Sequence, residues 1–231
     1  MTEGVGRKMN VLIILAHPDR GSLNHAIAGA VRDDMRAEGH DVVFHDLYAE
    51  RFDPLLVADE IPEDTDIPPL IQSHCRELCS ADGIVIVHPN WWGQPPAILK
   101  GWIDRVFRPG LAYRFQEGDS GEGVPIGLLR AKAAVVLNTS NTEKARENAV
   151  FGDPLEAIWR NCIFELCGIR SFHRRTFRVV VTSTKEQRAG WIEDAKLLCR
   201  SAFEPGTRNQ TPEDAHHADP LRDAGQREGG L

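Results

Sequence analysis

Three short polar segments carry the residues best suited to hold a phosphorylated ligand. They are 17–24, 89–96 and 138–142, and each follows a run of apolar residues. In the first segment, Ser22 stands where a helix N-cap is expected, and Asn24 follows it. The free N–H groups and partial positive charge of a helix N-terminus form a ready phosphate site. Ser22 is explained equally well as a cap that serves only the helix.

The first segment contains neither GxGxxG nor a GKS or GKT sequence, so it is neither a dinucleotide fingerprint nor a P-loop. Its opening AHPD (16–19) also begins the zinc-dependent N-deacetylases of sugar conjugates, which are an alternative from another class. In those enzymes the motif continues with Asp-Glu, whereas Arg20 follows Asp19 here. His17 and Asp19 alone are too few ligands for catalytic zinc. We therefore expect no metal site.

Alternating strands and helices must position the three segments. Strands are expected at 10–16, 41–47, 83–89, 131–139 and within 171–181. Helices are expected from Leu23 to a stop at Gly39, and at 70–79, 97–107, 154–167 and 185–203. This alternation predicts an α/β fold, a doubly wound five-stranded parallel sheet between two helical layers, with strand order 2-1-3-4-5. Ligands bind such sheets beyond the carboxyl ends of the strands, where the polar segments lie.

The composition is that of an ordinary globular protein, with 231 residues, 42% of them apolar, and a net charge of −7. An acidic chain is a poor general partner for nucleic acid, and no run approaches the roughly 20 apolar residues of a membrane span. The polar N-terminus is unlike a secretion signal, so we expect a cytoplasmic protein. We expect one domain over 8–203 and a disordered tail over 204–231, which is rich in proline, glycine and charge.

A second motif gives the first segment a narrower interpretation. The run HPNWWGQPPAILKGWIDRVFRPGLAYRF (88–115), together with the first segment, resembles the NAD(P)H:quinone oxidoreductases of the flavodoxin-like superfamily. The resemblance implies FAD or FMN as cofactor, NAD(P)H as electron donor and a small quinone-like aromatic acceptor. It implies that the phosphate end of the flavin contacts His17, Ser22, Leu23, Asn24 and Ala26, and that the ring contacts Pro89, Asn90, Trp91, Trp92 and Gly93.

The third segment departs from the Thr-Thr-Gly-Gly turn that is usual in this family. It keeps polar groups that we also expect at the cofactor, in Asn138, Thr139, Ser140 and Asn141. The family's quinone reductases place a tyrosine and a histidine just beyond, but ENAVFGDP (147–154) has apolar residues near those places. The candidates for a catalytic side chain are therefore Tyr113 and Arg146. Azo and nitroaromatic compounds are acceptors that the same hydride transfer can serve.

The end of the second motif bears on assembly. Tyr113 and Phe115 match aromatic positions that in the family wall the acceptor pocket from the partner subunit, which implies a homodimer. The segment 116–129 is then a loop near the mouth of the site. Of the two adjacent tryptophans, we expect one to pack inward and one to line the pocket, because neighbouring side chains at a strand end point opposite ways.

One alternative remains within the same fold: a flavodoxin-like protein that binds FMN and passes single electrons or regulates a partner. The segments 97–107 and 111–115 favour the reductase, because in the resembling family they build the slot in which donor and acceptor bind in turn.

Overall fold

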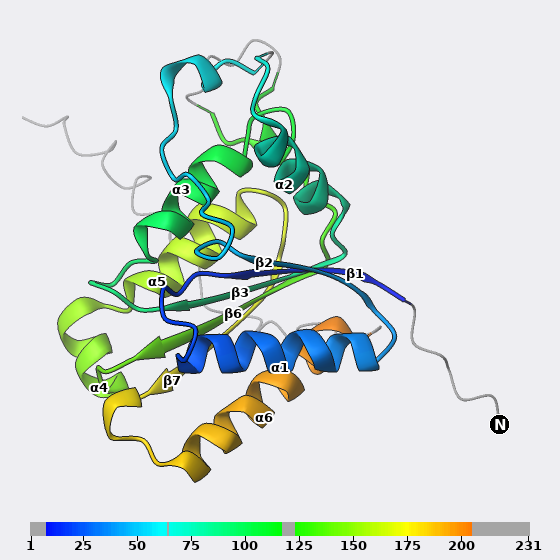
Figure 1. Ribbon diagram of the computed structural model, residues 1–231. Coiled ribbons are helices and arrows are strands. Elements are labelled where there is room, and N and C mark those ends of the chain that lie inside the picture. The colour runs from blue at the N-terminus through cyan, green and yellow to red at the C-terminus, as the bar shows by residue number, and fades with distance from the viewer. Residues whose placement is uncertain (1–7, 64, 117–122, 205–231) are drawn as a thin grey trace, which may run out of the picture.

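A five-stranded parallel sheet forms the centre of the computed structural model, which describes residues 8–63, 65–116 and 123–204 (Figure 1). Its strands are β1 Asn10–Leu15, β2 Asp41–Asp46, β3 Gly83–Pro89, β6 Ala133–Ser140 and β7 Ser171–Arg178. Their order is β2-β1-β3-β6-β7, which is the expected 2-1-3-4-5 when only the strands of this sheet are counted. The winding changes direction between β1 and β3, and such a switch point opens a crevice at the carboxyl ends.

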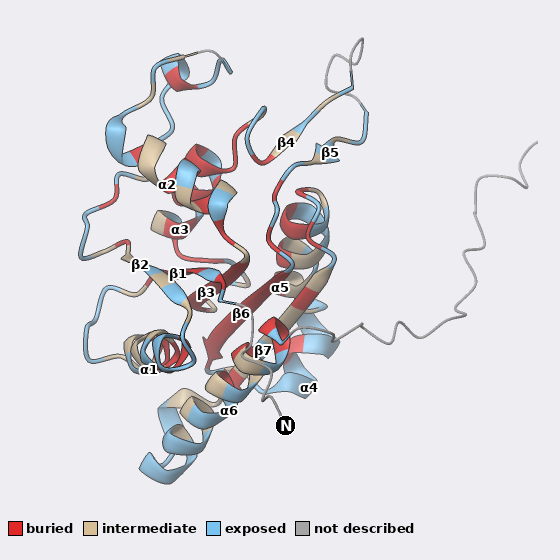
Figure 2. Cartoon of the chain, turned by 90° about the vertical axis from the view of Figure 1, so that its right-hand side faces the viewer, coloured by how far each residue is buried: buried red, intermediate tan, exposed pale blue. Residues whose placement is uncertain are grey.

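Helices cover both faces of the sheet. Helices α1 Leu23–Ala37 and α6 Lys185–Phe203 lie side by side on one face, while α2 Pro69–Ser80, α3 Ala97–Val106 and α5 Pro154–Ala157 cover the other (Figure 1). Alternate residues of β1 belong to two cores: Leu12 and Ile14 to the core under α2 and α3, and Val11, Ile13 and Leu15 to the core under α1 and α6. Strands β3 and β6 are buried along their whole length (Figure 2). Burial on both faces explains why their sequences are continuous apolar runs.

Side-chain caps mark the starts of α1 and α6. The Ser22 hydroxyl accepts a hydrogen bond from the backbone N–H of His25 at the start of α1. Thr184 and Gln187 form a reciprocal capping box at the start of α6. Within the part of the chain that the structure describes, no helix is both long and apolar enough to cross a membrane.

Short elements between the strands differ from the expectation. The helix expected at 154–167 is α5 followed by the π-helix η3 Ile158–Glu165, and a short α4 Lys144–Arg146 runs into a second π-helix, η2 Glu147–Phe151. Strand β4 Tyr113–Arg114 pairs with β5 Ile126–Gly127, so part of the expected loop 116–129 is a strand. These elements are too short, or too far from a period of 3.6, to show in the sequence pattern. Residues 117–122 of that loop, and 205–231 of the expected tail, lie outside the described residues.

The connection from β2 to α2, residues 51–69, contains the 3-10 turn η1 Ala58–Glu60 and packs closely on α3. Gly101 of α3 has no room for a side chain, since a Cβ atom there would lie 2.2 Å from the carbonyl oxygen of Pro54. Arg105 of α3 is 5% exposed and donates to both carboxylate oxygens of Glu60, at 2.9 and 2.5 Å. A buried ion pair therefore fixes this long connection to the helix that follows the second polar segment.

Candidate active site

A cavity of about 890 Å³ opens beyond the carboxyl ends of β1, β3 and β6. Its volume lies within the range of about 300–1,000 Å³ that is typical of small-molecule sites. The loops after these three strands provide most of the wall, and the rest comes from η2, the start of α5, η4 Val180–Thr182 and α6. The lining residues are His17, Asp19, Gly21, Ser22, Leu23, Asn24, Pro89, Asn90, Trp91, Trp92, Gly93, Thr139, Ser140, Asn141, Thr142, Glu147, Phe151, Pro154, Val180 and Arg188.

Asn24 joins the first loop to the third. Its side chain is 3% exposed, and its Nδ2 donates to Thr139 Oγ1 at 2.9 Å. The other amide atom, Oδ1, is buried without a hydrogen-bond partner among the described residues. A buried acceptor without a partner costs about 1–3 kcal/mol, so this atom is suited to receive a donor from a ligand in the cavity.

His17 and Asp19 shape the first loop. The backbone N–H of Asp19 donates to His17 Nδ1 at 3.1 Å, and the backbone N–H of Gly21 donates to Asp19 Oδ1 at 2.8 Å. The imidazole of His17 lies 6.0 Å from the ring of Trp91, measured between ring centroids. Burial lowers the pKa of His17, so the imidazole is neutral near pH 7. His17 therefore contributes a neutral, partly apolar wall rather than a positive charge.

The second loop carries two exposed tryptophans, which corrects the expectation that one packs inward. Trp91 is 40% exposed and Trp92 is fully exposed, and both line the cavity. Trp92 and Gly93 both have positive φ, 57° and 72°. Reciprocal backbone hydrogen bonds join Trp91 to Gln94. This tight turn replaces the extended strand end on which the alternation argument depended, so both rings face the cavity side.

Asn90 is the polar centre of the second loop. Its backbone N–H donates to the carbonyl of Thr139 at 2.7 Å, which fixes the loop against β6. Its side-chain Nδ2 donates to Glu147 Oε1 at 3.1 Å, and its Oδ1 is buried without a partner among the described residues. Asn90 therefore holds a second buried acceptor without a partner among the described residues, and like Asn24 it is bonded to Thr139 of β6.

Asn138 is not part of the cavity wall, contrary to the expectation from the sequence. Its side chain is fully buried, and its Nδ2 lies 2.8 Å from His88 Nε2. Trp159 Nε1 also donates to His88 Nε2, at 3.0 Å, so that nitrogen is an acceptor and the proton is on Nδ1, which faces the carbonyl of Pro89. Burial, and to a smaller extent the charge of Arg174, lowers the pKa of His88 to about 4, so His88 stays neutral. Successive side chains of β6 alternate between faces, which places Asn138 in the core and Thr139 at the cavity.

Three more expected residues lie away from the cavity wall. Ala26 is exposed on α1 and does not line the cavity. Tyr113 packs edge to face on Phe115, with ring centroids 5.8 Å apart, and Arg146 lies over the ring of Phe151. Neither Tyr113 nor Arg146 lines the cavity of its own chain. The remaining cofactor-binding residues implied by the resemblance are brought together around one space.

Glu147 is a cavity residue that sequence reasoning missed. It is 2% exposed, receives the Asn90 amide, and lies 3.9 Å from Arg178 Nη1 through its Oε2. It belongs to the π-helix η2, whose wide turn directs a residue inward that a regular helical period does not single out. Arg188 of α6, the one arginine among the lining residues of the described chain, was also missed, because it is distant in sequence from all three loops.

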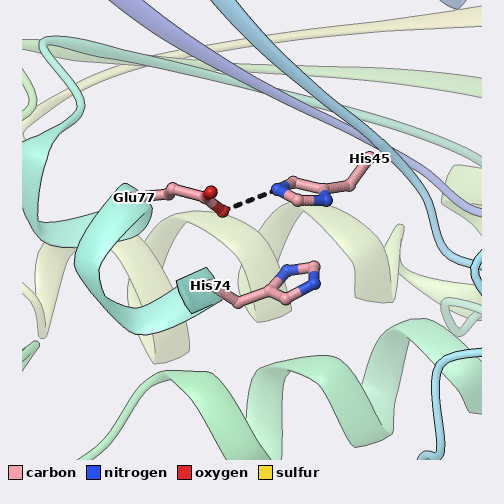
Figure 3. A group of neighbouring side chains, drawn as sticks. All are labelled: His45, His74 and Glu77. Carbon is pink, nitrogen blue, oxygen red and sulfur yellow. Dashed lines mark hydrogen bonds and ion pairs between the residues drawn. The ribbon is translucent and has the colours of Figure 1, made fainter. Parts of the chain in front are cut away.

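A second polar cluster lies outside the cavity, between β2 and α2. His74 and Glu77 of α2 project toward His45 of β2 (Figure 3), and one ligand atom from each lies within 4.8 Å of the others. His45 has a carboxylate oxygen at each ring nitrogen, Glu50 at 2.8 Å and Glu77 at 2.7 Å, so both nitrogens carry protons. Trp102 Nε1 donates to His74 Nδ1, which places the proton of a neutral His74 on Nε2. With these protons in place the cluster is an imidazolium paired with two carboxylates, and a metal ion could bind its ring nitrogens only by displacing protons.

The charge of this cluster predicts a pH window for stability. Burial opposes the charge on His45 but is outweighed by Glu50 and Glu77, so its pKa is raised above 6.5. Burial likewise opposes the charge on Glu50, but His45 and His74 outweigh it and hold its pKa at about 2. The His45 contribution is complete below pH 6.5 and is lost as the pH rises through its raised pKa. The Glu50 contribution is complete above 4.5 and is lost as the pH falls toward 2.

We therefore expect His45→Gln to reduce the free energy of unfolding most between about pH 4.5 and 6.5. Hydrogen bonds to charged groups are worth about 1.5–3 kcal/mol, so the loss is measurable by urea unfolding across a pH series. Arg32→Gln is the control, because Arg32 pairs with the exposed Asp33. A His45→Gln loss that is the same at pH 5.5 and pH 9 would contradict the assignment of charge.

Comparison with known proteins agrees with this geometry. Residues 9–197 match the model of a protein family whose description is 'flavodoxin-like fold'. An uncharacterised NAD(P)H oxidoreductase of Haemophilus influenzae is 35% identical over 190 residues, covering 80% of this chain and 91% of that protein. NAD(P)H dehydrogenase (quinone) 1 of Rattus norvegicus is 34% identical over 215 residues, covering 84% of this chain and 77% of the rat protein.

Solved structures share the fold. An NAD(P)H:quinone oxidoreductase from Methanothermobacter marburgensis superposes with a TM-score of 0.73 at 23% identity, covering 85% of this chain and 98% of the other. An FMN-dependent NADH-azoreductase of Bacillus anthracis, solved with FMN, superposes with a TM-score of 0.66 at 15% identity, covering 84% and 99%. The chain belongs to the NAD(P)H:quinone oxidoreductase family of the flavodoxin-like superfamily, as its motifs predicted, and it is an oxidoreductase.

Proposed function

We propose that this protein is a flavin-dependent NAD(P)H oxidoreductase that transfers two electrons to a small quinone-like aromatic acceptor. The observation that carries the proposal is that Asn24 and Asn90 line one cavity, while the buried Oδ1 of each has no hydrogen-bond partner within the described part of the chain. These two acceptors require hydrogen-bond donors from a ligand. A flavin has such donors in its ribityl hydroxyls and in its ring N–H. The same cavity offers a helix N-terminus for phosphate, so the residues present fit the group.

The phosphate end of the flavin is assigned to the first loop. Ser22 and the backbone N–H groups at the start of α1 face the cavity, where the helix dipole favours an anion. The guanidinium of Arg188 adds a positive charge to the same cavity. It is held in place by hydrogen bonds to Ser183 Oγ at 2.7 Å and to the carbonyl of Val180 at 3.2 Å.

The ring end is assigned to the second and third loops. When bound, the flavin would supply a ring that accepts hydride from NAD(P)H and passes the two electrons on to the acceptor. Asn90 presents its amide oxygen there, and Thr139, Ser140 and Asn141 supply further polar groups. Trp91, Trp92 and Phe151 give the cavity aromatic walls that bind planar molecules and exclude water. The fully exposed Trp92 leaves the mouth open, which favours a reductase over a protein that only shields FMN.

The names of the relatives support the donor and the acceptor. The Haemophilus protein is called an NAD(P)H oxidoreductase and the rat protein an NAD(P)H dehydrogenase (quinone). The FMN-bound azoreductase has the same fold, which supports a flavin without deciding between FMN and FAD. We assign the flavin-binding domain to residues 8–203.

A second copy of the chain completes the site in this proposal. Tyr113 and Phe115 do not line their own cavity, and the neighbouring β4–β5 pair leaves Leu111, Ile126 and Leu128 at least 36% exposed. Apolar side chains gathered in this way favour a protein interface. Light scattering should give twice the mass of the chain, and a monomer that reduces quinones at full rate would contradict the shared site.

The cofactor assignment is tested on the purified protein. We expect it to be yellow, to release FMN or FAD whose mass identifies it, and to be bleached by NADPH or NADH without oxygen. Adding a quinone to the bleached protein should restore the colour, because the acceptor takes both electrons. A colourless protein that gains no thermal stability from either FMN or FAD would refute the proposal.

A further inference from the structure

A row of three side chains leads from the cavity wall to β2. Ser22, the N-cap of α1, lines the cavity, and its Oγ lies 3.1 Å from His25 Nδ1. On the other side of the imidazole, Nε2 lies 3.0 Å from Oδ2 of Asp46, the last residue of β2. The side chains of His25 and Asp46 are each 16% exposed. The row thus connects an atom that faces the ligand space to a carboxylate largely screened from water.

The local structure holds this row in one arrangement. The Ser22 hydroxyl oxygen also accepts from the backbone N–H of His25, at 3.3 Å, so the cap and the imidazole are fixed together. The other oxygen of Asp46, Oδ1, accepts from the backbone N–H groups of Tyr48 and Ala49, both at 3.1 Å. An ionised carboxylate only accepts hydrogen bonds, so His25 Nε2 carries a proton.

The charge of His25 then decides what Ser22 can do. In the neutral imidazole, Nδ1 is an acceptor, and the Ser22 hydroxyl donates its hydrogen to it, away from the ligand space. In the imidazolium, Nδ1 is a donor to Ser22 Oγ, which already accepts from the His25 backbone. The hydroxyl hydrogen of Ser22 is then available to an anion in the cavity.

We propose that His25 is a positioning residue for the phosphate end of the bound flavin, and that binding is coupled to the uptake of one proton at His25. The proton makes Ser22 a donor toward phosphate and adds a positive charge at a helix N-terminus, where phosphate is already favoured. This inference rests on the function proposed above.

The titratable groups that face His25 permit this charge. The carboxylate of Asp46 on β2 favours the imidazolium directly. His17 lies in the loop before α1, edge-on to His25 with ring centroids 6.3 Å apart. Burial, and to a smaller extent the charge of His25, lower the pKa of His17. His17 is therefore neutral near pH 7, where it does not repel a charged His25.

The experiment measures FMN affinity of the apoprotein by fluorescence quenching from pH 5.5 to 8.5, in the full chain and in His25→Gln. One coupled proton changes affinity by up to tenfold per pH unit. We expect the advantage of the unchanged chain over His25→Gln to shrink by about tenfold from the acid end to the alkaline end of this range. Taking the ratio of the two proteins cancels the titration of the FMN phosphate itself.

Three further measurements separate positioning from a merely structural role. Riboflavin lacks the phosphate, so its affinity should show no such pH-dependent ratio. Ser22→Ala should lose most of the pH dependence although His25 is present, and Asp46→Asn should move the profile to lower pH while keeping binding at the acid end. Calorimetry in two buffers of different ionisation enthalpy should show proton uptake on FMN binding that His25→Gln lacks.

The outcomes separate this inference from the proposed function. No binding of FMN or FAD at any pH would refute the function. FMN binding with the same pH profile and the same proton uptake in His25→Gln and the unchanged chain would overturn the role of His25 and leave the function standing.

Discussion

Replacing Glu60 by alanine is expected to destabilise the fold by about 3–5 kcal/mol, because it leaves the guanidinium of Arg105 buried without its carboxylate. Both residues of this pair are 5% exposed, and two hydrogen bonds join their side chains. Arg105 Nη1 also contacts Asp53, at 2.7 Å to its carbonyl and at 3.9 Å to its exposed carboxylate, and this distant, solvated carboxylate does not replace Glu60. Urea unfolding of the flavin-loaded protein measures the loss.

The double variant Glu60→Ala with Arg105→Met is the matched control. Replacing both partners of a buried pair by apolar groups is often close to neutral, so the double variant should recover most of the stability lost by Glu60→Ala. A double variant as unstable as Glu60→Ala would show that the cost arises from packing in the segment 51–69 rather than from an uncompensated charge.

Gly93→Ala is expected to weaken flavin binding by at least about tenfold, which corresponds to 1.4 kcal/mol. Gly93 has φ of 72°, and a Cβ atom there would lie 2.8 Å from Cγ of Pro154, on the other side of the cavity wall. The turn at 91–94 must shift to relieve this contact, and Asn90 and Trp92 shift with it. Titration of the apoprotein with FMN and FAD measures the effect.

Gly152→Ala separates the clash from the backbone strain. Gly152 has nearly the same φ, 70°, but a Cβ atom there meets nothing within 4 Å. It should therefore weaken binding much less than Gly93→Ala, and adding Pro154→Ala to Gly93→Ala should restore part of the affinity. Equal losses in Gly93→Ala and Gly152→Ala would mean that positive φ alone, and not the contact with Pro154, matters.

The sheet was predictable from the sequence because its central strands are buried on both faces. NVLIIL and GIVIVHP read as continuous apolar runs for that reason, and β1 and β3 occupy these residues. The start of α6 was equally predictable, because Thr184 and Gln187 form a capping box between residues close in sequence. Strands that are buried along their whole length, and helix caps formed by residues close in sequence, can therefore be predicted from sequence patterns.

The wall of the cavity was only partly predictable. Asn138 and Thr139 are adjacent polar residues, and their division between core and cavity depends on which face of β6 each one meets. Glu147 is brought inward by a π-helix, and both tryptophans are kept on the cavity side by a tight turn in which Trp92 and Gly93 have positive φ. These placements depend on tertiary geometry at single residues, so a helical or strand periodicity in the sequence does not predict them.

The last strand of the sheet, β7, pairs only with β6 among the described strands, so one row of its backbone groups is not used within the sheet. Two consecutive arginines of β7 carry charge beside this row. Arg174 donates to Glu156 of α5 on one face of the sheet, and Arg175 donates to Asp194 of α6 on the other. Charged side chains along an edge strand disfavour the addition of a foreign strand beside them. The charges beside β7 therefore work against polymerisation through this edge of the open sheet, so that surfaces elsewhere on the molecule are better suited to assembly.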